Sequence, residues 1–220
     1  KHHSRLYLED EKSRAVITSG DLEIVVDKEA GSLARVSRQG KTIIMNGPVF
    51  NIWRGPLDND GIKGKAVQWK SKDELLQKWM TAGFDTLNCE THRIDIIPTT
   101  DGIITVRIDQ RYTCRDSQKG FSHSHVYSIM PSGIIIVDNT FKVDKGQPDV
   151  PRLGVRMTIN GNFSNLTWFG RGPHENYADR KAGAPISKYS GMVSEQYYPY
   201  IVPQENGNKE DVRLFSLVDS

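Results

Sequence analysis

Apolar and polar residues alternate along most of this chain with a period of two. In the segment IITVRIDQRYTC, Ile104, Val106 and Ile108 would lie on one face of an extended chain. Arg107 and Asp109 would lie on the other face. Because successive side chains of a β-strand point to opposite faces of a sheet, this pattern predicts an antiparallel strand that is half buried. The same alternation recurs in six more segments: DLEIVVD, SLARVSR, SHVYSIM, IIIVDNTFKV, RLGVRMTI and DVRLFSLV.

Turn-forming residues separate these segments. The signals are Gly31-Ser32, Asn46-Gly47-Pro48, Asp101-Gly102, Pro131-Ser132-Gly133 and Asn160-Gly161. At least eight strands with almost no helix predict an all-β fold, a sandwich or a barrel.

One short helix is expected near residues 72–82. Ser71 and Glu74 have the spacing of a capping box, and Gly83 supplies a stop signal. The polar start of the chain, residues 1–18, is typical of a linker from an upstream domain, which leaves residues 19–220 as one β domain.

Composition narrows the class of protein further. Hydrophobic residues make up 37% and charged residues 25% of the 220 residues, as in globular proteins. The 29 Lys and Arg residues nearly balance the 27 Asp and Glu residues, and the two signs are interspersed. We therefore expect no nucleic-acid partner, which would need clustered basic residues. The longest apolar runs are far too short to span a membrane, so no membrane partner is expected either. The compartment stays open.

The segment WFGRGPHENYADR, residues 168–180, concentrates residues that could carry chemistry. Gly170 and Gly172 suggest a phosphate loop, but Glu175 stands where a third glycine is needed and no helix pattern follows. Glycoside hydrolysis needs two carboxylates, and the loop residues Asp58, Asp60, Glu175, Asp179 and Glu205 could form such a pair. Loop carboxylates more often cap turns or pair with arginine.

A metal site is not expected. His123 and His125 would lie on one face of a strand, but spacing supplies no third ligand, and half-exposed strand histidines are the simpler interpretation. Asp58, Asn59 and Asp60 resemble part of a calcium loop without its remaining ligands. Cys89 and Cys114 lack the spacing of a zinc site or a disulfide framework.

Aromatic residues in the two long loop segments are the clearest binding signal. Sugars stack on such rings, yet aromatic residues at the corners of a sandwich are more often part of the core. The residues are Trp53, Trp69, Trp168, Tyr177, Tyr189, Tyr197, Tyr198 and Tyr200.

Five segments occur together in an order that is specific to one family. They are WRGPLDNDGI, LLQKWMTAGFD, PRLGVRMTI, WFGRGPHENYADRKAGAPISKYSG and YPYIVPQENGNKEDVR. From about Asp21 to Leu217 the chain resembles the C-terminal small-chain domain of glycoside hydrolase family 2 β-galactosidases. The resemblance implies a large antiparallel β-sandwich similar to galactose mutarotase, a supersandwich that would be incomplete at its C-terminus here.

The resemblance also implies a non-catalytic role for this domain. In the family, the catalytic glutamates lie in an upstream barrel domain, which would be the partner of this domain in the parent chain and bring it near the galactoside substrate. The parent often uses Mg and Na through residues outside this region, and no cofactor is expected here. The family's usual substrate contact, a tryptophan in a GGDDSW-like segment, has no counterpart in this sequence. The corner at residues 168–180 would then be structural, with Asp179 and Arg180 satisfying loop backbone, or would contact the barrel.

Nine loop residues are the candidates for a carbohydrate or interdomain contact: Asp58, Asn59, Asp60, Trp168, His174, Glu175, Asn176, Tyr177 and Arg180. Two other functions stay open, a free-standing carbohydrate-binding module and a mutarotase-like epimerase that would need a histidine and a carboxylate in one pocket. The last strand, in DVRLFSLVD, is expected to leave an uncovered edge through which the chain could self-associate.

Overall fold

The computed structural model describes residues 5–61, 75–115 and 117–219. The chain divides into two compact units. The first unit comprises Lys1–Trp53 and Gln77–Ile159, and the second comprises Arg54–Leu76 and Asn160–Ser220.

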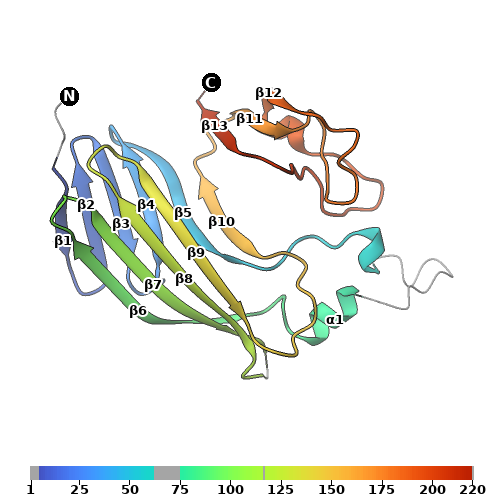
Figure 1. Ribbon diagram of the computed structural model, residues 1–220, viewed down its shortest axis with the longest axis horizontal. Helices are drawn as coiled ribbons and strands as arrows, with labels where there is room; N and C mark the ends of the chain where they lie inside the picture. Colours follow the sequence, from blue (N-terminus) through green and yellow to red (C-terminus); the bar gives the residue numbers. More distant parts are fainter. Residues whose placement is uncertain (1–4, 62–74, 116, 220) are drawn as a thin grey trace. The chain divides into compact units, whose positions relative to one another are not determined.

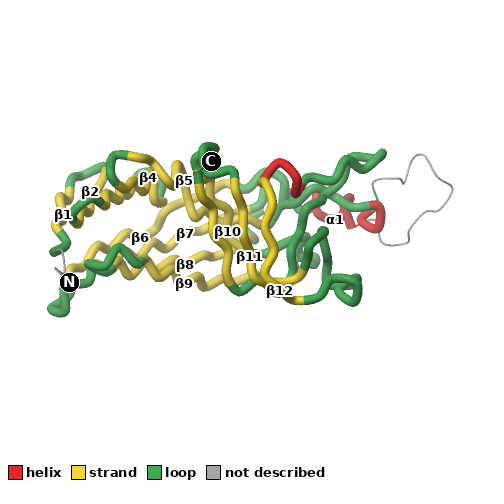
Figure 2. The backbone as a smooth tube through the Cα atoms, turned by 90° about the horizontal axis from the view of Figure 1, so that it is seen from above, coloured by secondary structure: helices red, strands yellow, loops and turns green. Residues whose placement is uncertain are grey.

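The first unit contains two antiparallel sheets that face each other (Figures 1 and 2). The six-stranded sheet has the order β1 (Tyr7–Asp10), β2 (Arg14–Ser19), β3 (Leu22–Asp27), β4 (Ser32–Arg38), β5 (Lys41–Asn51) and β10 (Gly154–Ile159). The four-stranded sheet has the order β6 (Asn88–Pro98), β7 (Ile104–Thr113), β8 (Gly120–Ile129) and β9 (Ile135–Val143). The all-β sandwich expected from the alternation is confirmed.

Side chains from both sheets form the core of this unit. On β3, Ile24 and Val26 point inward, and on β7 Val106 and Ile108 do the same, all of them fully buried. Each such side chain contributes about 1.5–3 kcal/mol when it leaves water. The apolar residues that recur at every second position therefore form the core that stabilises the sandwich.

The structure corrects the linker expected over residues 1–18. Residues 7–10 and 14–19 are β1 and β2, and Ala15 and Ile17 are fully buried in the sandwich core. Ile17 lies opposite Ile24 on the neighbouring strand. The segment RAVITS alternates like the other strands, but the polar residues around it obscured the pattern.

The helix expected near residues 72–82 is present in its described part as α1 (Leu75–Thr81). The proposed cap, Ser71 and Glu74, lies outside the described residues. Trp79 on α1 is buried and donates a hydrogen bond from Nε1 to the Asp149 carbonyl oxygen at 2.8 Å. Its ring also meets Trp53 edge-on, with ring centroids 6.4 Å apart.

The second unit is built on a three-stranded antiparallel sheet and long loops. The sheet has the order β12 (Ile186–Met192), β11 (Asn165–Arg171) and β13 (Leu214–Val218). Two short 3-10 helices, η1 (Asp58–Asp60) and η2 (Val193–Gln196), belong to its loops.

The strand β13 lies at an edge of this sheet. It pairs with β11, and no other strand in the described part of the chain pairs with it. Leu214 and Phe215 are 67% and 54% exposed.

An uncovered apolar edge strand can pair with another chain, so we expect the isolated chain to self-associate as its concentration rises. Sedimentation velocity across a dilution series measures this, and Ser216→Lys, which places a charge on the edge strand, should shift the chain toward monomer. Ser216→Thr is the matched control. A chain that stays monomeric at every concentration would contradict the expectation.

Candidate functional site

The corner at residues 168–180 begins with a buried tryptophan. Trp168 on β11 is 3% exposed and donates from Nε1 to the Arg171 carbonyl oxygen at 2.9 Å. Its ring packs on Tyr189 with centroids 5.4 Å apart. A Cβ atom on Gly172 would come within 2.7 Å of the Tyr189 ring, so the close approach needs glycine. In this conformation the indole of Trp168 is part of the packing and offers no face to a sugar.

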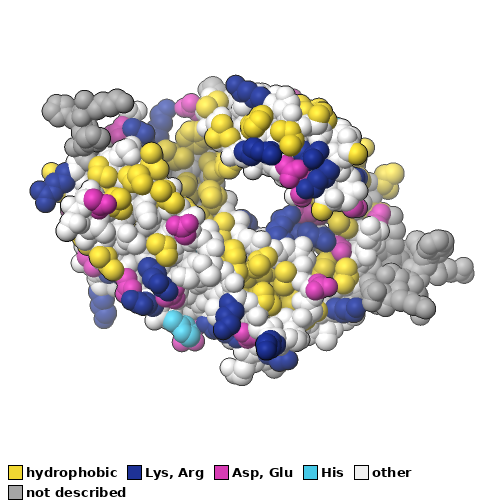
Figure 3. Space-filling view, in the orientation of Figure 1, with side chains coloured by type: hydrophobic (Ala, Val, Ile, Leu, Met, Phe, Trp, Pro, Cys, Tyr) yellow, Lys and Arg dark blue, Asp and Glu magenta, His cyan; other side chains and the backbone are white. Residues whose placement is uncertain are grey.

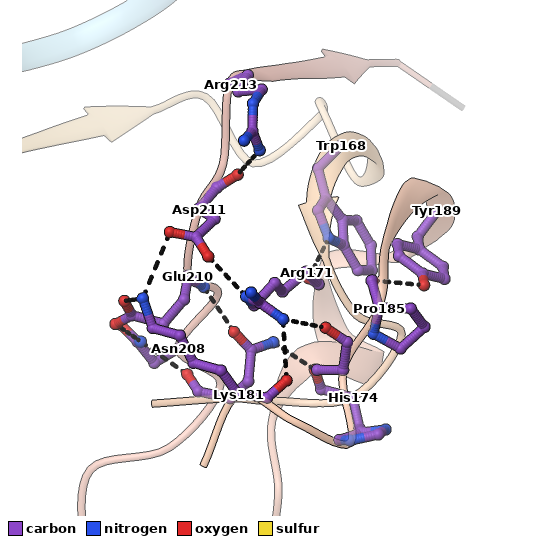
Figure 4. A network of polar contacts seen from close by, with 12 residues as sticks. Trp168, Arg171, His174, Lys181, Pro185, Tyr189, Asn208, Glu210, Asp211 and Arg213 are labelled. Atoms are coloured by element: carbon purple, nitrogen blue, oxygen red, sulfur yellow. Dashed lines mark hydrogen bonds and ion pairs between the residues drawn. The ribbon is translucent and has the colours of Figure 1, made fainter. Parts of the chain in front are cut away.

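Arg171 ties three segments of the second unit together (Figure 4). Its Nη1 donates to the carbonyl oxygens of Lys181 and Ala184 at 3.0 and 2.9 Å, and its Nε donates to Asp211 Oδ2 at 2.6 Å. The hydrogen bond from Arg171 lowers the pKa of the Asp211 carboxyl. The backbone role that the sequence suggested for Arg180 therefore belongs to Arg171.

Asn176 crosslinks the corner to the segment before β13. It is fully buried, and its Oδ1 accepts a hydrogen bond from the Glu210 backbone N–H at 2.8 Å. Its Nδ2 donates to the His174 carbonyl oxygen at 3.1 Å. The buried Asn176 side chain thus bonds backbone groups of both segments, while His174 itself is an exposed residue.

Glu175 anchors the neighbouring loop through both of its carboxylate oxygens. Oε2 accepts from the Gly207 N–H at 2.8 Å. Oε1 accepts from Arg180 Nη2 at 3.0 Å and from the Tyr200 hydroxyl. This hydrogen bond to Glu175 raises the pKa of Tyr200. The Arg180 guanidinium lies 4.7 Å from the centroid of the Tyr177 ring, and burial raises the pKa of Tyr177 to about 12.

The segment RGPLDND folds around a buried ion pair. Asp60 accepts two hydrogen bonds from the Arg54 guanidinium, at 2.6 and 3.2 Å, and one from the Leu57 N–H at 2.6 Å. The Gly55 N–H donates to Glu205 Oε2 at 2.9 Å, and the Asp58 N–H donates to Gln204 Oε1 at 3.4 Å. These bonds fix the loop against residues 204–205.

Three loops of the second unit meet around a pocket of about 280 Å³. Its lining comes from residues 57–59, from the corner and from residues 200–205: Leu57, Asp58, Asn59, Tyr177, Asp179, Arg180, Tyr200, Gln204 and Glu205. Four of the nine candidate residues line it, namely Asp58, Asn59, Tyr177 and Arg180. Asp60 and Glu175 do not line the pocket but accept hydrogen bonds from the backbone N–H groups of Leu57 and Gly207. The pocket is also not lined by Trp168, Asn176 or His174.

Leu57, Asp179, Tyr200, Gln204 and Glu205 line the pocket but were absent from the candidate contact residues. Three of them had a signal in the sequence, because Tyr200 was among the loop aromatics and Asp179 and Glu205 among the loop carboxylates. Leu57 and Gln204 had none.

The two strand histidines lie in the first unit and are buried, in contrast to the half-exposed positions expected. His123 Nε2 is 2.9 Å from Asn139 Oδ1, and His125 Nε2 is 3.0 Å from Gln110 Oε1. Burial, followed by repulsion from His123, lowers the pKa of His125 to about 3. Neither imidazole hydrogen-bonds a carboxylate within the described residues.

Basic and acidic side chains are intermixed on the face of the molecule shown in Figure 3. Over residues 5–61, 75–115 and 117–219, no group of three or more His, Cys, Asp or Glu side chains is placed to hold a metal ion. In the same part of the chain, no helix is long and apolar enough to cross a lipid bilayer.

The sequence of the chain matches one protein family. Residues 18–220 match the family model described as the β-galactosidase small chain. A β-galactosidase of Priestia megaterium is 30% identical over 217 residues, which cover 99% of this chain and 20% of that protein. A β-galactosidase of Psychromonas ingrahamii is 28% identical, with 94% and 20% covered, and one of Kluyveromyces lactis is 26% identical, with 96% and 20% covered. The chain thus spans about one fifth of the length of these relatives.

Proposed function

Because this chain belongs to the β-galactosidase small chain family, we propose that it is a non-catalytic domain of a larger β-galactosidase. The observation that carries the proposal is the family match over residues 18–220, in a chain that spans about one fifth of its relatives. The parent would be a glycoside hydrolase that cleaves terminal β-D-galactosides with retention of configuration.

Retaining hydrolysis needs two carboxyl groups about 5–5.5 Å apart, one as acid and base and one as the nucleophile. We assign both to a catalytic barrel elsewhere in the parent. Two of the loop carboxylates of the second unit stabilise the fold, since Glu175 accepts from Gly207 and Arg180, and Asp60 accepts from Arg54. The carboxylate oxygens of both residues are thus already engaged by donors of the fold.

In this proposal the domain packs on the barrel of the same parent and shapes the mouth of its active site, where the galactoside enters. Any Mg or Na that the parent uses would be held by residues outside this chain. Residues 174–198 carry exposed charged and aromatic groups of the second unit, among them Arg180, Lys188 and Tyr197, and they are the surface that we assign to this contact.

The isolated chain should not hydrolyse a nitrophenyl β-galactoside above the rate of buffer alone. The physical reason is that the pair of carboxyl groups required for retention lies outside it. The measurement is release of nitrophenol by chain that has been purified through several orthogonal steps. Turnover that stays constant per mole of chain through those steps would refute the assignment of the catalytic pair.

The alternative function, a free-standing carbohydrate-binding module, is favoured by one observation, the pocket between the three loops of the second unit. Its stacking platform would not be Trp168, which is buried.

A further inference from the structure

The pocket lined by residues 57–59, 177–180 and 200–205, here called the loop pocket, has walls that are fixed without any ligand. The Gly55 N–H bonds to Glu205, and the Tyr177 hydroxyl donates to the Glu205 carbonyl oxygen at 3.2 Å. The Arg180 side chain is held in place by Glu175, whose Oε1 accepts a hydrogen bond from Arg180 Nη2 at 3.0 Å. A pocket with preformed walls loses little conformational entropy when a ligand enters, and this favours binding.

Several polar groups at the loop pocket retain hydrogen-bonding capacity. Arg180 uses Nη2 for Glu175 and Tyr200, while its Nη1 and Nε donate to no described residue. Within the described residues, the Asn59 amide and the Asp179 carboxylate also form no hydrogen bond or ion pair, and both residues are exposed. Donors and acceptors are therefore available side by side.

The lining also selects the chemical class of the ligand. Asp58, Asp179 and Glu205 outnumber the one guanidinium, of Arg180, which disfavours an anion such as phosphate. A metal ion has no suitable cluster in the described residues. A neutral ligand with many hydroxyl groups fits, because each hydroxyl both donates to a carboxylate and accepts from a guanidinium or an amide.

Size and apolar surface agree with this class. Pockets for drug-sized ligands measure roughly 300–1,000 Å³, so a pocket of about 280 Å³ suits something smaller, such as one sugar ring. Tyr177, Tyr200 and Leu57 supply apolar surface for the C–H groups of such a ring.

We propose that the loop pocket binds one neutral hexose unit, with Asp179, Asn59 and Arg180 as the hydroxyl-binding residues. This is a sugar-binding site on the small chain itself, separate from the catalytic pair assigned to the parent. It rests on the alternative function given above, carbohydrate binding by the isolated chain, and is independent of the non-catalytic role in a parent enzyme.

The test is a titration of the isolated chain with D-galactose, lactose and D-glucuronate, followed by calorimetry and by amide NMR shifts. We expect saturable binding of galactose or lactose with a dissociation constant of about 1 mM, as for a ligand of this size. A response to galactose alone would mean a free monosaccharide, and a tighter response to lactose would mean the terminal unit of a longer sugar. Either supports the proposal.

Asp179→Ala and Asn59→Ala should each weaken binding at least about tenfold, the usual effect of losing a hydrogen bond to a ligand. Both residues are exposed and pair with no described residue, so the fold should survive. The matched controls are Asp138→Ala and Asn162→Ala, at exposed positions that do not line the pocket, and they should leave affinity unchanged.

Absence of saturable binding to both neutral sugars, tighter binding of glucuronate, or full affinity in Asp179→Ala would overturn the proposal. None of these results would affect the proposed function, which is tested by turnover.

Discussion

Arg171→Ala is expected to destabilise the second unit by about 2–4 kcal/mol. The guanidinium bonds the carbonyl oxygens of Lys181 and Ala184, and Ala184 is fully buried. Hydrogen bonds to a charged group contribute about 1.5–3 kcal/mol each, and partial exposure of the side chain reduces the sum. Without the arginine, the Ala184 carbonyl oxygen loses this donor, and the Lys181 carbonyl oxygen keeps only the hydrogen bond from the Ala184 N–H at 3.0 Å.

Hydrogen exchange of the β11 amides measures this effect within the second unit. A loss of about 2–4 kcal/mol should speed their exchange roughly 30- to 1,000-fold, if exchange occurs through opening of the unit. Arg213→Ala is the matched control, because Arg213 bonds the Asp211 carbonyl oxygen at 2.7 Å at an exposed position. It should change exchange less than about fivefold. Equal effects of the two substitutions would show that Arg171 does not hold the corner together.

Acid is expected to destabilise the first unit well above the pH at which carboxylates titrate. The pKa of His125 is lowered to about 3, mainly by burial, from an ordinary value of about 6.5 in the unfolded chain. Between these values the unfolded chain takes up a proton that the folded chain refuses. The stabilising effect of the neutral imidazole is complete above about pH 6.5 and is lost as the pH falls toward 3.

From pH 7 to pH 5 this linkage removes about 2 kcal/mol through His125 alone. His123 adds to the loss in the same direction, because burial lowers its pKa too. Urea unfolding at pH 7, 6 and 5 measures the slope. His125→Gln should flatten the slope even if it lowers stability at pH 7, whereas His92→Gln, at an exposed position, should leave it unchanged. An unchanged slope in His125→Gln would mean that His125 does not titrate as its burial implies.

The strands were predictable because one local rule generates them. Ile104, Val106 and Ile108 point inward on β7 as their spacing predicts, and β3 and β4 lie close to the bounds read from the sequence. The same rule could have placed His123 and His125 correctly. Both histidines lie on the inward face of β8 with Tyr127. The half-exposed positions were expected because histidine is polar, although the alternation places both residues on the buried face.

The loop pocket was only partly predictable, because it depends on contacts between segments far apart in sequence. The hydrogen bonds from the Gly55 N–H to Glu205 and from the Gly207 N–H to Glu175 span 150 and 32 residues. No local pattern encodes such pairings. The sequence marked the loops as long and rich in aromatic and charged residues, but it could not tell that Trp168 would be buried while Tyr200 would line a pocket.

The central claim is that this chain is a non-catalytic part of a β-galactosidase, and complementation tests it most directly. The remainder of the parent polypeptide, expressed without residues 1–220, is assayed on a nitrophenyl β-galactoside with and without the isolated chain. The account predicts no turnover by the chain alone and a saturable rise in the activity of the remainder as the chain is added. Turnover by the purified chain alone, or a remainder whose activity is unchanged at every concentration of added chain, would contradict it.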